Sequence, residues 1–143
     1  MEYNMIVPGI KMAGSVIKKI VMENSIVDTT KEAKRTMGMS INEPYIAESD
    51  GDLFAQMTID FEIVVEQDEE QKFKMNLSIE GAFVSDEGAS KEEFKKLVAV
   101  NGAAALIGIA RGKVEAITAN TFNAGKVVMP FVNVIDYYKS TTK

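Results

Sequence analysis

The stretch LFAQMTIDFEIVVE, residues 53–66, carries an apolar side chain at every odd position from Leu53 to Val65. Most of the side chains between them are polar, including those of Asp60 and Glu62. Successive side chains of a β-strand point to opposite faces, so this period of two predicts a strand with one buried face and one solvated face.

The stretch FKMNLSIEGAF, residues 73–83, repeats the alternation, and the polar run EQDEEQ, residues 66–71, joins the two. Two half-buried strands with a short polar connection predict an antiparallel hairpin whose sheet is covered on one side only.

Two weaker strands are expected before this hairpin, at residues 10–23 and 35–48. Pro44 limits the second of them to an edge or a bulge, because proline cannot donate a hydrogen bond to a neighbouring strand. The SDGD sequence at 49–52 is a turn of the Asp-Gly kind that joins paired strands. The region before residue 85 therefore predicts four antiparallel strands.

Helical signals follow. Ser90 and Glu93 form a capping box that opens a helix, Asn101-Gly102 interrupts it, and a longer helix continues to about Asn120. An extended segment at 126–134 and a short helical turn at 136–140 come next. Strands first and helices second predict an α+β fold, a four-stranded antiparallel sheet with helices packed on one face.

The long helix is unusually poor in side-chain volume. A row of small residues runs along it at a spacing of four: Ala104, Gly108, Gly112 and Ala116. Such a row lets another backbone approach closely. Either the helix lies close on its own sheet through this row, or the row is an oligomer interface and the helix lies between its own sheet and a partner subunit.

The composition is that of a soluble globular protein, with 46% hydrophobic and 26% charged residues among 143. We expect a single domain over residues 1–143. The apolar clusters are interrupted before the roughly 18 residues that a membrane span needs, and no secretory signal pattern opens the sequence. We therefore expect a cytoplasmic protein without membrane insertion.

Catalysis has little support in the sequence. It contains no cysteine and no histidine, which removes thiol nucleophiles and histidine bases. The DGD turn at 50–52 lacks the further ligands of a calcium loop, and no glycine-rich stretch has the pattern of a phosphate loop. The net charge of -5 argues against a nucleic-acid partner. We predict no catalytic residue, no metal site and no cofactor.

Methionine is abundant, with nine residues. Methionines often fill a core, but their flexible thioethers also suit a surface that must accept many apolar shapes. Met37 and Met39, on the weakest predicted strand, are the better candidates for such a surface.

The order of these elements resembles the SecB family of protein-export chaperones over residues 10–138. Three stretches carry the resemblance: FKMNLSIEGAF at 73–83 is similar to the family's last strand, NGAAALIGIAR at 101–111 to its long helix, and VVMPFVNV at 127–134 to its Pro-x-x-Asn segment.

The resemblance implies a homotetramer, a dimer of dimers whose long helices lie between two sheets, and a holdase that binds unfolded polypeptides without ATP. It places client binding in an apolar groove between the first crossover and the last helix. The matching residues here are Ile26, Val27, Met37, Met39, Tyr45, Ile135 and Tyr138.

Export members of the family also dock on the motor SecA through acidic side chains. The matching positions here are Lys19, Glu23, Lys74 and Asn76, and only Glu23 is acidic. A SecB-like chaperone with a dedicated client, such as an antitoxin, therefore fits as well as one in general export. The alternative hypothesis is an oligomeric adaptor or structural protein with the same fold that binds one folded partner.

Overall fold

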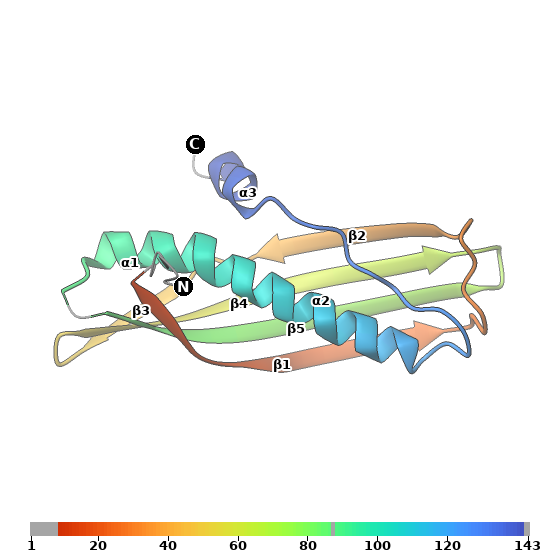
Figure 1. Cartoon of the computed structure of the whole chain (residues 1–143), viewed down its shortest axis with the longest axis horizontal. Helices are drawn as coiled ribbons and strands as arrows, with labels where there is room; N and C mark the ends of the chain where they lie inside the picture. Colours follow the sequence, from red (N-terminus) through yellow and green to blue (C-terminus); the bar gives the residue numbers. More distant parts are fainter. Residues whose placement is uncertain (1–8, 87, 142–143) are drawn as a thin grey trace, which may run out of the picture.

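Five antiparallel strands form one sheet in the order β1-β5-β4-β2, with β3 also paired to β4 (Figure 1). The computed structural model describes residues 9–86 and 88–141. The strands are β1 Ile10–Asn24, β2 Lys34–Ile41, β3 Tyr45–Ser49, β4 Asp52–Glu66 and β5 Lys72–Ser85. The predicted hairpin is the central pair, β4 and β5, and the α+β class with helices on one face is confirmed.

The sheet has five strands and not the predicted four, because Pro44 divides the second strand. The backbone N–H of Asn42 still donates to the carbonyl of Thr58, and pairing resumes with Tyr45 opposite Gln56. Glu43 and Pro44 therefore stand opposite a single residue of β4, as in a β-bulge. The Asp-Gly turn between β3 and β4 forms as expected, with positive φ at Asp50 and Gly51.

The core lies on one face of β4 and β5. Burial alternates along both strands, from Leu53 to Val65 and from Phe73 to Phe83. The opposite face carries mostly polar side chains and is solvated, as the period of two predicts.

One continuous helix crosses the strands obliquely over the buried face (Figure 1). It consists of α1 Lys91–Leu97, the π-helical turn η1 Val98–Gly102 and α2 Ala103–Ala119. Ser90 caps it, because its hydroxyl accepts the N–H of Glu93 at 3.1 Å. The predicted interruption at Asn101-Gly102 is a widened turn and not a break.

Two buried glycines lie in tight contacts between this helix and the sheet. A methyl group on Gly102 would lie 3.0 Å from the ring of Phe83, and one on Gly81 of β5 would lie 2.8 Å from Leu106. A side chain at either position would therefore force the Phe83 ring or the Leu106 methyl groups to shift. The contact therefore fixes where the helix lies on β5.

By length and composition alone, the 29-residue helix Lys91–Ala119 could span a membrane, since its most apolar window has a mean hydropathy of 1.4. The interrupted apolar clusters of the sequence do not predict such a helix. In this fold one side of it packs on the sheet as a core helix, with Phe94, Val98 and Leu106 fully buried.

An extended segment follows α2 and leads to α3 Val134–Thr141, which is longer than the single turn predicted. The segment is anchored where the hydroxyl of Thr118 accepts the backbone N–H of Val127 at 2.8 Å. The same hydroxyl donates to the carbonyl of Val114, so this buried group is fully paired. Val127 and Met129 then enter the core.

The connection between β1 and β2 is fastened to the end of α2. The N–H of Asn123 donates to the carbonyl of Val27, and the N–H of Thr29 donates to the carbonyl of Ala124. The Asn24 amide bonds both backbone groups of Ile26. This crossover is therefore an ordered part of the fold.

We predict that Gly81→Val lowers the free energy of unfolding by about 1–3 kcal/mol, the usual cost of overpacking a core. The added carbons would collide with Leu106 and Phe83. Chemical denaturation measures the effect. Gly14→Val on β1 is the control, because a side chain there meets open space. An equal loss in both variants would contradict the close contact.

We predict that Thr118→Val lowers the free energy of unfolding by about 1–3 kcal/mol, because it leaves the buried N–H of Val127 without an acceptor. Thr121→Val is the matched control, since the Thr121 hydroxyl donates to the carbonyl of Ile117 and to the sulfur of Met22, and neither bond anchors the segment after α2. Thermal unfolding of the two variants should differ clearly. Similar transition temperatures would argue against the anchoring role.

Candidate polypeptide-binding surface

The row of small residues on α2 faces away from the sheet. Ala104, Gly108, Gly112 and Ala116 are all exposed, and no atom lies within 4 Å of a methyl group placed on either glycine. The explanation that this row lies on its own sheet is therefore wrong. The buried face is formed by other residues: Ala103, Leu106, Ile107, Ala110, Val114 and Thr118. The oligomer interface remains a prediction, now on an open surface.

Arg111 holds the extended segment beside this row. Its guanidinium donates to the carbonyls of Met129 at 3.2 Å and Pro130 at 3.1 Å. Its central carbon also lies 4.3 Å from the centre of the Phe131 ring, which is a cation–π contact. Phe131 is 91% exposed, so an aromatic ring is displayed in a fixed place on the surface.

A groove of about 600 Å³ separates the helix from this segment. Ala104, at the start of the small-residue row, lines one side of the groove, and Phe131 and Ile135 line the other. The row and the groove are therefore one continuous surface of small and apolar groups on the helical side of the molecule.

Four of the seven residues predicted to bind a client lie on the helical side of the sheet. Met37 and Met39 of β2 stand opposite the buried Ile63 and Phe61, so they point to the covered face, where they are half-buried. The other two, Ile135 and Tyr138, belong to α3.

The other three do not join them. Ile26 is 3% exposed, so its assignment to a client surface is wrong in this conformation: the fastened crossover turns its side chain into the core. Val27 is 65% exposed at the crossover, beside Asn123. Tyr45 is 69% exposed but pairs with Gln56 on the opposite, solvated face of the sheet.

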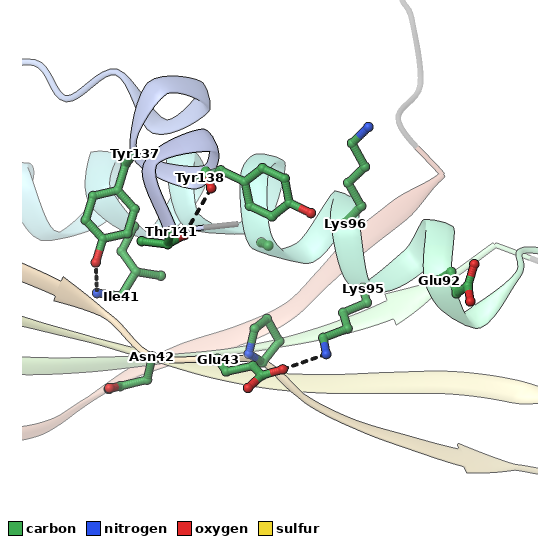
Figure 2. A pocket seen from close by; sticks show the side chains of 11 residues that line it. Ile41, Asn42, Glu43, Glu92, Lys95, Lys96, Tyr137, Tyr138 and Thr141 are labelled. Atoms are coloured by element: carbon green, nitrogen blue, oxygen red, sulfur yellow. Dashed lines mark hydrogen bonds and ion pairs between the residues drawn. The ribbon is translucent and has the colours of Figure 1, made fainter. Parts of the chain in front are cut away.

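A second hollow, of about 540 Å³, lies beneath α3 (Figure 2). Tyr137 and Tyr138 of α3 face it from one side. The β2–β3 connection and α1 complete its walls, and its other lining residues are Ile41, Asn42, Glu43, Pro44, Glu92, Lys95, Lys96, Ala99 and Thr141. Tyr138 and Ile135 therefore line different hollows, with α3 between them.

Two contacts hold the walls of this hollow together, and both involve residues that the sequence analysis did not single out. The Lys95 ammonium lies 2.6 Å from the Glu43 carboxylate, and the Tyr137 hydroxyl accepts the backbone N–H of Ile41 at 3.2 Å. The hydrogen bond and charge of Lys95 lower the pKa of Glu43, and those of Glu43 raise the pKa of Lys95. Both side chains are solvent-exposed, which keeps this ion pair weak.

The positions that match the SecA contact lie together on the solvated face of the sheet. Glu23 of β1 stands opposite Lys74 of β5, and Asn76 is two residues further along. Lys19 follows on β1 opposite Ser78. The neighbour of Glu23 is thus a cation, so the patch is mixed in charge and not acidic.

The ionisable groups of the described residues show no arrangement typical of catalysis. No group of three or more aspartates and glutamates there could hold a metal ion. The clear pKa shifts belong to exposed side chains: besides Glu43 and Lys95, the pKa of Asp68 is lowered because its carboxylate accepts the backbone N–H groups of Glu70 and Gln71. The exposed apolar side chains beside the groove, Phe131 and Ile135, can instead contact apolar groups of another molecule.

Comparison with known proteins gives a structural likeness. No family model and no curated protein sequence matches the chain. A SecB-like chaperone of Mycobacterium tuberculosis, solved in complex with a ChAD peptide from the HigA1 antitoxin, matches 87% of this chain and 91% of its own, with a TM-score of 0.60 and 9% sequence identity. A protein of unknown function from Streptococcus agalactiae matches 85% of this chain and 97% of its own, with a TM-score of 0.46 and 11% identity. The fold of this chain is SecB-like.

Proposed function

We propose that the protein is an ATP-independent holdase chaperone that binds unfolded or non-native polypeptides in the cytoplasm. The observation that carries the proposal is a SecB-like fold whose helical side displays apolar groups around fixed grooves. Holding a client requires only that apolar surface be buried reversibly, and this surface supplies it without a chemical step.

The solved SecB-like chaperone with an antitoxin peptide makes a dedicated client the more specific form of the proposal. The mixed charge around Glu23 and Lys74 also favours a client other than one delivered to SecA. We infer that this chain binds a segment of a partner polypeptide.

Assembly into a homotetramer, a dimer of dimers, is part of this proposal. The exposed row from Ala104 to Ala116 would accept the helix layer of a second subunit, because small side chains let backbones approach closely. The adjoining groove, with the fixed ring of Phe131, would extend that contact. Exposed apolar patches of this kind usually mark a surface that is buried when another molecule binds.

We predict that the purified protein suppresses aggregation of a chemically denatured model client at a near-stoichiometric ratio, without nucleotide. Light scattering of the diluted client measures this. No suppression at several-fold excess would refute the holdase function.

The adaptor alternative gives a different result in the same experiments. An adaptor would leave client aggregation unchanged. In a pull-down, it would bind one folded partner in a stoichiometric complex. Recovery of that single complex together with no affinity for unfolded chains would replace the holdase proposal by the adaptor.

We predict that Gly108→Leu and Gly112→Leu dissociate the tetramer while the subunit stays folded, since neither side chain meets an atom of its own chain. Light scattering gives the mass, and circular dichroism checks folding. Gly108→Ala is the matched control: alanine is already part of the row, and it stabilises a helix by roughly 0.5–1 kcal/mol relative to glycine. An unchanged mass for the folded leucine variants would refute the interface.

A further inference from the structure

Asn101 and Gly102 form a dipeptide with a chemical reactivity of its own. Asn101 is the only asparagine of the sequence that is followed by glycine. In an unfolded chain, the backbone nitrogen after an asparagine can attack the side-chain amide, and a side chain on that next residue hinders the attack. Asn101 is therefore the most reactive side-chain amide of the unfolded chain.

The attack closes a five-membered ring. The backbone nitrogen of Gly102 loses its proton and forms a bond to the side-chain carbonyl carbon of Asn101, and the amide nitrogen leaves as ammonia. Water then opens the cyclic imide at one of its two carbonyl groups. The products are aspartate and isoaspartate, and in isoaspartate the main chain continues through the side-chain carbon.

The folded backbone prevents this ring from closing. Closure requires the Cβ of Asn101 and the nitrogen of Gly102 to be nearly eclipsed about the bond between the Cα and the carbonyl carbon of Asn101. Helical backbone holds these two atoms well apart. Asn101 lies in the turn η1 between Val98, with φ −64° and ψ −45°, and Gly102, with φ −64° and ψ −44°. The turn must therefore open before Gly102 can react.

A contact with the sheet keeps this turn closed. Asparagine and glycine are both poor helix formers, so local propensity contributes little. Gly102, however, is buried, and a methyl group on it would lie 3.0 Å from the ring of Phe83 on β5. Asn101 itself is exposed, so water reaches its side chain. Displacement of Gly102 from Phe83 is therefore the step that makes the amide reactive.

The isoaspartate product does not fit the closed turn. It lengthens the main chain by one carbon directly before Gly102, which shifts Gly102 relative to the Phe83 ring. The new carboxylate also faces the groove that Asn101 lines together with Phe131 and Ile135. One event thus alters both a core contact and the surface beside the small-residue row.

We propose that Asn101 is a latent deamidation site, which the contact between Gly102 and Phe83 keeps closed in the folded chain. Opening of the turn exposes the site, and formation of isoaspartate makes the opening permanent. Chemical modification of an opened state is a general cause of irreversible unfolding. This inference does not depend on the proposed holdase function.

Peptide mass spectrometry of the full chain tests where the reaction occurs. The protein is incubated in buffer and in guanidinium chloride at the same mildly alkaline pH, and the conversion of amide to acid is followed at each asparagine. We expect Asn101 to convert fastest in denaturant and at least about ten-fold more slowly in the folded chain. Asn76, in β5 and followed by leucine, is the slow internal reference.

Two results of this experiment would overturn the proposal. Equal rates at Asn101 in buffer and in denaturant would show that the fold does not close the site. A rate in denaturant no faster than that of Asn76 would show that Asn101 is not the reactive amide.

A pair of variants isolates the contact with the ring. Phe83→Leu removes the ring beside Gly102. Phe73→Leu is the matched control on the same strand, because the Phe73 ring packs on Phe122 instead, with ring centres 5.2 Å apart. We expect Asn101 to convert at least about five-fold faster in the folded Phe83→Leu variant than in the folded control. Equal rates in the two variants overturn the role of Phe83.

Refolding tests whether the change is permanent. Asn101→Gln keeps an amide but would have to close a slower, six-membered ring, and Asn101→Asp carries the charge without the extra main-chain carbon. After long incubation in denaturant and dilution, we expect the original chain to lose native helix in proportion to its isoaspartate content, measured by circular dichroism. The glutamine variant and the freshly unfolded aspartate variant should recover fully. Equal losses in the original chain and the glutamine variant overturn the irreversible step, and failure of the aspartate variant to refold overturns the main-chain explanation.

Discussion

The close packing of the long helix on β5 is the contact on which the rest of the structure depends. Gly102 lies on the ring of Phe83, and Leu106 lies over Gly81, so close that a larger residue at either glycine would displace the ring or the Leu106 methyl groups. This contact sets the rotation of the helix, so Leu106 and Ala110 face the sheet and Gly108 and Gly112 face outward. The π-helical turn at Val98–Gly102 keeps Phe94 and Leu106 on the same buried side. The exposed small-residue row is therefore a consequence of core packing.

Much of the fold could be predicted from the sequence because alternation is a strong signal. The alternation of apolar and polar side chains defines both strands of the central hairpin, from Leu53 to Val65 and from Phe73 to Phe83. The helix gave a weaker signal, since its buried face also contains the small residues Ala103 and Ala110. Spacing alone could not decide which small face meets the sheet, and only the contacts of Gly102 and Gly81 decide it.

The candidate site was harder to predict, for two physical reasons. Met37, Met39 and Tyr45 are all odd-numbered and would share one face of a regular strand, but the extra residue at the Pro44 bulge moves Tyr45 to the opposite face. Ile26 is buried because a segment nearly a hundred residues away fastens its loop through Asn123, which no local pattern reveals.

The same bulge also limits the free edge of the sheet. Without it, Lys34 to Ser49 would form one long strand with an uninterrupted free edge, which is an aggregation hazard. Pro44 ends β2, and Tyr137 occupies the donor at Ile41, so the available edge is limited to a few positions around Met37 and Met39. The small-residue row lies on a different element, α2, but it meets the groove at Ala104, so assembly and client binding adjoin on the helical side of the molecule.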